Sequence, residues 1–216
     1  GASSASNAAK IKNVVFLGDK VETIGEGAFR YCTSLTGIDL PASVTEIGSQ
    51  AFENCASFVQ FTVPANVKSI GSNAFKNCAK LRVVVNLSSL TVTAGDSGNG
   101  GVAANAILVT TDPNATNLTT TQDGFIFYDD GTNVRLIGYA GTNTAITLPA
   151  SFNGKSYGIY EYAFQGNTSL TSVTISGGVT SIGDYAFQDC TGLTSVTISG
   201  GVTSIGDYAF EGCSGL

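Results

Sequence analysis

A run of identical residues that occurs twice constrains the fold of this chain more than any other feature. The run TSVTISGGVTSIGDYAF covers Thr171–Phe187 and recurs without a single change at Thr194–Phe210. A repeat of this length and fidelity is typical of a solenoid, in which each unit stacks on its neighbour to complete a shared core. We therefore expect a one-dimensional array of coils.

Six Ala-Phe pairs set the register of the array. Their Phe residues form two evenly spaced series with the same period as the twin run, and the same apolar pattern precedes each one. The pattern L-x-x-I-x-L ends in the alternation of a short strand with one buried face, and V-x-x-I indicates a second extended piece. We expect a short helical turn to carry Ala and Phe inward. The two series are Phe29, Phe52 and Phe75, and Phe164, Phe187 and Phe210.

Each unit has a glycine and a polar residue before the expected turn. We interpret glycines such as Gly48 and Gly183 as positions of positive φ. Asp184 and Asp207 follow such glycines, and we interpret them as N-caps of the turn. The alternative is a stacked carboxylate pair that binds a cation, which would need more oxygen ligands than the sequence supplies.

The period fails between Phe75 and Phe164, where the two Phe series are separated. Strand-like residues at 125–128 and 134–139 flank Asp129-Asp130-Gly131, a strong signal for a β-hairpin. The repeat then resumes with four extra residues within Ser151–Gly158. We therefore expect a β-rich interruption inside the array. Val83 and Val85 lie at its start in positions that should face solvent, so we expect later residues to cover them.

These breaks suggest four segments. No signal peptide is visible in the first ten residues, which are small and polar, so we expect any export signal to have been removed. Val15 and Leu17 match the inward positions of a partial first unit. Leu216 lies one full period after Leu193, so we expect the array to continue further. The segments are 1–10, a cloning remnant and flexible lead-in; 11–86, N-terminal repeats; 87–145, an irregular β-rich insertion with a hairpin; and 146–216, C-terminal repeats.

The repeat resembles a known family. The pattern L-x-x-I-x-L-P-x-x-V-x-x-I-G-x-x-A-F-x-x-C is matched at Leu35–Cys55 and, with Gly-Gly for Pro-Ala, at Leu170–Cys190. It is similar to the BspA-type leucine-rich repeat family of surface proteins, over roughly two thirds of the chain. Asn167 in place of Cys and Tyr160 in place of Gly are departures that leave the expected fold unchanged.

The resemblance implies both a fold and a location. The implied fold is a right-handed, curved α/β solenoid, β-rich with short helical turns, here interrupted by the hairpin-containing insertion. The implied location is extracellular or at the cell surface of a bacterium or mucosal protozoan. Some members of the family attach to host matrix proteins or to other bacteria, which makes a protein or glycoprotein the expected partner.

Composition removes several classes of function. The net charge is −6 and no cluster of Lys and Arg occurs, which argues against nucleic-acid binding. No apolar run is long enough to cross a bilayer. The chain has no histidine, which removes the usual general base and the commonest zinc ligand. We expect no enzyme activity, no cofactor and no metal site.

The five cysteines each lie three residues after a repeat Phe. Zinc sites favour C-x-x-C pairs, whereas neighbouring cysteines here are at least one full period apart. We interpret them as a stacked ladder of buried thiols that pack as small apolar groups. Disulfides between stacked coils are the alternative, which an odd number of equivalent thiols disfavours. The ladder would contain Cys32, Cys55, Cys78, Cys190 and Cys213.

Two acidic clusters have alternative chemical readings. Asp129 and Asp130 are adjacent carboxylates that could mimic a glycosidase pair, but a hairpin turn explains them better. Asp96 and Asn99 could offer oxygen atoms to calcium, but the set is too poor and a Gly-rich loop is favoured.

Tyrosines are the candidate binding residues. Exposed tyrosines favour recognition because they combine rigid area with a hydroxyl group, whereas packing against the next coil is their structural alternative. Three of them precede a repeat Phe and should form a ladder on one outer face. Three others lie near the interruption. The two sets are Tyr162, Tyr185 and Tyr208, and Tyr139, Tyr157 and Tyr160.

We therefore expect a monomeric, non-enzymatic module, secreted or at the cell surface, that binds a protein or a host glycoprotein. The first alternative is a structural spacer that presents another domain. A glycan-active enzyme is a remote third.

Overall fold

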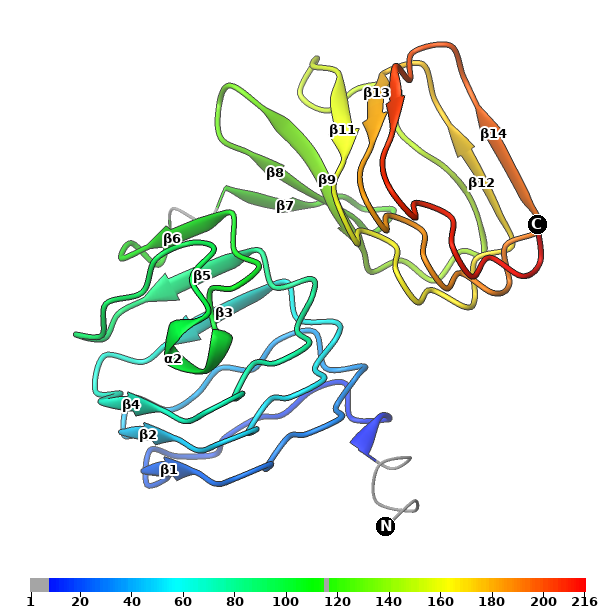
Figure 1. Cartoon of the computed structure of the whole chain (residues 1–216). Coiled ribbons are helices and arrows are strands. Elements are labelled where there is room, and N and C mark those ends of the chain that lie inside the picture. Colours follow the sequence, from blue (N-terminus) through cyan, green and yellow to red (C-terminus); the bar gives the residue numbers. More distant parts are fainter. Residues whose placement is uncertain (1–7, 115–116) are drawn as a thin grey trace. The chain divides into compact units, whose positions relative to one another are not determined.

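The computed structural model describes residues 8–114 and 117–216, which form two compact units, each built as a β-solenoid (Figure 1). The units are Gly1–Thr116 and Asn117–Leu216. The predicted solenoid is confirmed. The first seven residues of the predicted lead-in lie outside the described residues.

The N-terminal unit contains two parallel sheets whose strands come from successive coils. Paired residues in neighbouring strands of the first coils are one sequence period apart, as in Thr23 opposite Glu46 and Glu46 opposite Ser69. The V-x-x-I pieces form the first sheet and the ends of L-x-x-I-x-L the second. The first contains β1 (Thr23–Ile24), β2 (Glu46–Ile47) and β4 (Ser69–Ile70); the second contains β3 (Gln60–Val63), β5 (Val83–Asn86) and β6 (Leu108–Thr110).

The C-terminal unit has the same two-sheet plan and adds a hairpin to one sheet. The three-stranded sheet contains β10 (Ala145–Thr147), β12 (Ser172–Ile175) and β14 (Ser195–Ile198). The six-stranded sheet has the order β15 (Ser204–Ile205), β13 (Val179–Ile182), β11 (Tyr157–Ile159), β9 (Val134–Tyr139), β8 (Phe125–Asp129) and β7 (Leu118–Thr120).

The predicted hairpin is present and belongs to the solenoid. Strands β8 and β9 are antiparallel, and β9 pairs in parallel with β11. Arg135 lies opposite Gly158 and Leu136 opposite Ile159, which is the same separation as between the repeats. At the other unit, β6 extends the sheet of β3 and β5. Both parts of the segment expected as an insertion therefore continue the coils beside them.

The segments expected to be short helical turns are instead runs of successive tight turns, in which residues with a left-handed backbone recur among residues with a right-handed one. In the coil at 160–167, Ala163, Gln165 and Asn167 donate their N–H groups to the carbonyl three residues earlier. The alternate residues Tyr162, Phe164 and Gly166 donate to the next coil. Tyr162 and Gly166 have positive φ, whereas Phe164 between them does not. Bonding between coils thus replaces the helix. Even α2 (Gly98–Gly101) contains left-handed residues.

Stacked aromatic rings fill the core of each unit. Phe29, Phe52 and Phe75 stack with ring centroids 5.4 and 5.1 Å apart, and the second Phe series stacks at 4.7 and 5.2 Å. The five cysteines are buried thiols, as predicted. Cys78, for example, donates its thiol proton to the Phe52 carbonyl at 3.2 Å. Burial raises the pKa of Cys78 to about 12, which keeps this thiol protonated and unreactive.

The expectation that the repeat glycines need positive φ is wrong. Gly48 and Gly183 lie outside the positive-φ glycines. A Cβ atom on Gly48 would lie 2.8 Å from the backbone nitrogen of Glu26, and one on Gly183 would lie 2.7 Å from that of Glu161. Close approach of the preceding coil therefore requires these glycines.

The alignment of the first partial unit is also wrong by one residue. Val15 and Leu17 are 77% and 98% exposed, whereas Val14 and Phe16 pack against the core. A shift of one residue reverses the faces of an extended segment. Val83 and Val85 are fully buried, so the expectation that they are covered is confirmed.

Candidate functional site

Three tyrosines form a stacked column on the turns of the C-terminal unit, which we call the tyrosine ladder (Tyr162, Tyr185 and Tyr208). The ring centroids of Tyr162 and Tyr185 are 5.1 Å apart and those of Tyr185 and Tyr208 are 5.2 Å apart, with nearly parallel planes. Tyr162 and Tyr185 are half-buried and Tyr208 is 59% exposed. The structure thus brings together three of the predicted site residues on one outer face.

Every residue of the tyrosine ladder has a left-handed backbone. The φ values are 57°, 55° and 54°. The Tyr162 N–H group donates to the Asp184 backbone carbonyl, and the Tyr185 N–H group donates to the Asp207 backbone carbonyl, both in the next coil. The corresponding positions of the N-terminal coils also have positive φ but carry Gly27, Gln50 and Asn73. The backbone therefore demands a left-handed residue there, but it does not demand tyrosine.

A second ladder of polar side chains lies three residues after the tyrosines. The Gln165 amide donates to Gln188 Oε1 at 2.6 Å, and the Gln188 amide donates to Glu211 Oε2 at 2.6 Å. Each Tyr and the residue three positions later belong to one turn, since the Gln188 N–H group donates to the Tyr185 carbonyl. The two ladders therefore lie on the same edge of the coils.

Carboxylates surround the tyrosine ladder. The Asp184 carboxylate accepts a hydrogen bond from the Asp207 N–H group of the next coil at 2.8 Å. The interpretation of Asp184 as an N-cap of its own turn is therefore wrong, because it bonds the following coil. Desolvation raises the pKa of Tyr185. Electrostatic interactions with its two ladder neighbours, Tyr162 and Tyr208, and with the carboxylates of Glu211 and Asp184 raise it further. The Tyr185 hydroxyl group is thus kept neutral.

The other three predicted tyrosines do not join the ladder. Tyr157 is 2% exposed; its hydroxyl donates to the Pro149 carbonyl at 2.7 Å and its ring meets Phe127 edge to face, so it is a core residue. Burial raises its pKa. Tyr139 is half-buried, with its ring 5.2 Å from that of Phe125. Tyr157 therefore offers no open aromatic surface, and Tyr139 packs beside Phe125 instead of joining the ladder.

Tyr160 borders a shallow groove of about 520 Å³ that sequence reasoning did not find. The groove crosses β9, β11 and β13, and the small residues Gly158 and Ser181 line it there. Arg135 lies in it, with its guanidinium carbon 5.6 Å from the centroid of the Tyr160 ring. Glu161 and Asp184, which directly precede two ladder tyrosines, line the groove as well.

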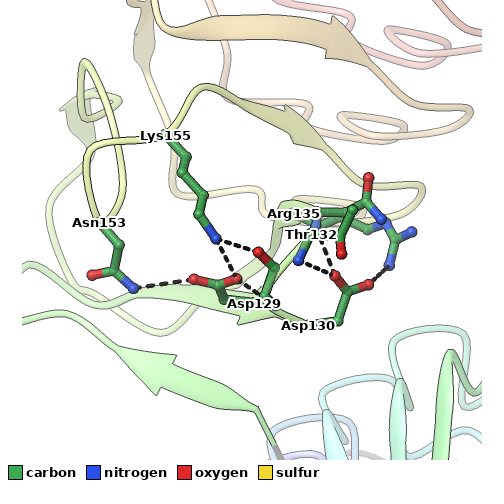
Figure 2. A network of polar contacts seen from close by, with 8 residues as sticks. Asp129, Asp130, Thr132, Arg135, Asn153 and Lys155 are labelled. Carbon is green, nitrogen blue, oxygen red and sulfur yellow. Dashed lines mark hydrogen bonds and ion pairs between the residues drawn. The ribbon is translucent and has the colours of Figure 1, made fainter.

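The hairpin carboxylates are engaged in a polar network (Figure 2). Asp130 Oδ1 accepts hydrogen bonds from the N–H groups of Thr132 and Asn133 at 2.9 and 2.6 Å, and Asp130 Oδ2 lies 3.8 Å from the Arg135 guanidinium. Asp129 accepts from the Gly131 N–H group at 2.9 Å. The pair therefore stabilises a turn, as the sequence favoured, and its carboxylates face different partners.

The four extra residues near Ser151–Gly158 hold the hairpin. Phe152 and Lys155 pair across a tight turn, and the Phe152 ring stacks on Phe127 of β8 at 4.2 Å. Lys155 Nζ lies 3.3 Å from Asp129 Oδ1 and donates to the Gly131 carbonyl at 2.7 Å (Figure 2). Asn153 donates to Asp129 Oδ2 at 3.2 Å. The sequence showed the four-residue expansion but did not show that it packs against the hairpin.

The alternative metal sites receive no structural support. Asp96 Oδ1 accepts from the Gly98 N–H group, and the Asn99 amide donates to Thr91. Within residues 8–114 and 117–216, no group of three or more His, Cys, Asp and Glu side chains could hold a metal ion. No helix in these ranges is long and apolar enough to cross a membrane.

Comparison with known families gives one match. A profile of the BspA type leucine rich repeat region matches six copies, over residues 2–97 and 142–216. No curated protein matches the chain.

Several solved structures resemble the chain. A leucine rich cell surface protein from Faecalibacterium prausnitzii A2-165 is 26% identical, with a TM-score of 0.46, and the match covers 92% of this chain and 45% of that protein. The pneumococcal vaccine antigen PcpA is 17% identical, with a TM-score of 0.45, and the match covers 92% and 59%. The leucine-rich repeat protein of T. pallidum is 24% identical, with a TM-score of 0.33, and the match covers 93% and 74%. The chain thus spans less than half of the Faecalibacterium protein.

Proposed function

The chain belongs to the BspA-type leucine-rich repeat family, and we propose that it is a non-enzymatic module, secreted or at the cell surface, that binds a protein partner through the tyrosine ladder. The family match supports both a repeat scaffold for interaction and the proposed location.

The observation that carries the proposal is the choice of tyrosine at a left-handed position. A side chain other than Gly or Asn at such a position costs about 1 kcal/mol or more. Two of the three N-terminal coils meet the same backbone demand with Gly27 and Asn73, which tolerate it, and the third carries Gln50. Three successive tyrosines, one of them 59% exposed, therefore indicate a use on the surface beyond the fold.

The geometry of the ladder favours a protein over a glycan. Rings stacked 5.1 and 5.2 Å apart in nearly parallel planes turn their faces toward one another, so the ladder presents mainly ring edges and hydroxyl groups. Stacking on a sugar would need open faces, and an open face is expected mainly at Tyr208. Tyrosine edges and hydroxyls suit the mixed polar and apolar surface of a protein.

Capture from a mixture of matrix proteins and mucins tests the proposal. The triple variant Tyr162→Asn, Tyr185→Asn and Tyr208→Asn keeps a residue that tolerates the left-handed backbone, as Asn73 does in the N-terminal unit. The matched control is Thr174→Val with Thr197→Val, on strands β12 and β14. We expect the wild type and the control to capture the same protein and the tyrosine variant to lose it, with all three equally folded by circular dichroism.

Two other outcomes would contradict the proposal. Capture by the tyrosine variant that equals capture by the wild type would show that binding takes place outside the ladder. Absence of any captured protein would favour the spacer, whose surface needs no ligand.

A further inference from the structure

The two units differ sharply in charge. Lys and Arg number eight in residues 1–116 and two in residues 117–216, whereas Asp and Glu number eight in each range. The whole net charge of −6 therefore belongs to the C-terminal unit, which carries the tyrosine ladder.

The two basic residues of the C-terminal unit are engaged at the hairpin. Arg135 lies 3.8 Å from Asp130 and Lys155 lies 3.3 Å from Asp129. Four exposed carboxylates on the turns of Tyr185 and Tyr208 lie outside these ion pairs, and we call them the acidic border: Asp184, Asp189, Asp207 and Glu211.

Two carboxylates of the acidic border accept hydrogen bonds from neutral groups. Asp184 accepts from the Asp207 backbone, and Glu211 accepts from the Gln188 amide. Both donors are neutral, so these hydrogen bonds do not pair the carboxylates with a cation. Asp184 and Asp207 each directly precede a ladder tyrosine and are exposed, and Asp184 and Glu211 lie close enough to Tyr185 to raise its pKa.

We propose that the tyrosine ladder and the acidic border bind a Lys- and Arg-rich segment of a protein partner. This inference rests on the proposed function and specifies the chemistry of its partner. Guanidinium groups form bidentate contacts with carboxylates and stack on tyrosine, which Tyr208 permits with its exposed ring.

Fluorescence anisotropy with a labelled peptide of alternating Arg and Ser tests this inference directly, with a peptide of alternating Glu and Ser as the comparison. We expect the Arg peptide to bind and the Glu peptide not to bind. The affinity for the Arg peptide should fall steeply as salt rises from about 50 mM to about 500 mM, since surface charges are screened.

Matched variants separate the acidic border from net charge. Asp184→Asn, Asp207→Asn and Glu211→Gln together keep the acceptor atoms and should weaken binding about tenfold. Asp39→Asn, Glu46→Gln and Asp112→Asn change the net charge equally in the N-terminal unit and should have less than about a twofold effect. Equal loss in both triple variants, or binding of both peptides, would overturn the inference.

The inference and the proposed function can fail separately. If the ladder captures a protein but the Arg peptide does not bind, the partner is not basic and the inference is overturned while the proposed function stands. If replacement of the ladder tyrosines by Asn leaves capture unchanged, the proposed function fails as well.

Discussion

The glycine after each V-x-x-I pair is determined by the neighbouring coil and not by its own backbone angles. Gly183 has no positive φ, yet a Cβ atom there would press on the Glu161 backbone of the preceding coil. Gly25 occupies the same place in the first coil, and a Cβ atom on it would meet nothing within 4 Å. One repeat position thus has two physical environments, which its letter in the sequence does not distinguish.

The pair Gly183→Ala and Gly25→Ala tests this explanation. We expect Gly183→Ala to lower the free energy of unfolding by about 3 kcal/mol, because the coils must separate to admit the methyl group. Gly25→Ala should be neutral or stabilise by up to about 1 kcal/mol, because Ala restricts the unfolded chain. Urea denaturation measures both. Equal destabilisation by the two variants would show that the backbone conformation at each position requires glycine, and not the approach of the neighbouring coil.

At the scale of elements, the hairpin β8–β9 shows where a periodic sequence stops being informative. The Phe spacing predicted the stacked coils, and Asp129-Asp130-Gly131 predicted the hairpin. The sequence did not reveal that β9 takes the place of a repeat strand, because the pairing of Arg135 with Gly158 depends on spatial register and not on matching letters. Tyr157 was misplaced for a related reason, since strand parity near the four-residue expansion decides whether its ring faces the core.

The candidate site was predictable in part. The ladder followed from Tyr at one fixed position of three successive units. The left-handed backbone beneath it did not, because alternating turns and a helix place Ala and Phe inward equally well. The groove beside Tyr160 arises from strands that the broken period had obscured.

Acid sensitivity of the hairpin provides a test at this scale. The Gly131 N–H group, the Asn153 amide and Lys155 hold the pKa of Asp129 below its ordinary value. Because the folded pKa is the lower one, the carboxylate stabilises the fold fully above the unfolded pKa of about 3.9 and loses this effect as pH falls through the folded value. We expect Asp129→Asn to reduce stability at neutral pH and to flatten its decline below about pH 4.

Urea denaturation across this pH range is the measurement, and Asp123→Asn is the control, in the exposed turn between β7 and β8. A pH profile of the Asp129 variant that matches wild type would show that the network in Figure 2 does not contribute to stability.

At the scale of the whole molecule, two units of one architecture differ in surface chemistry. Both stack Phe rings and bury thiols, so their cores are equivalent. The C-terminal unit alone combines the tyrosine ladder with the full net negative charge. A solenoid core can stay constant while its outer positions vary, and this division is the physical basis for assigning recognition to the C-terminal turns.

Hydrogen–deuterium exchange of the chain with its captured protein tests the central claim most directly. Amides in residues 160–167, 183–190 and 206–213 should gain protection on binding, because they lie on the turns that carry the tyrosine ladder. Residues 60–63 and 83–86, on the N-terminal sheet of β3 and β5, should be unchanged. Protection confined to that N-terminal sheet, with none on the three turns, would contradict the account.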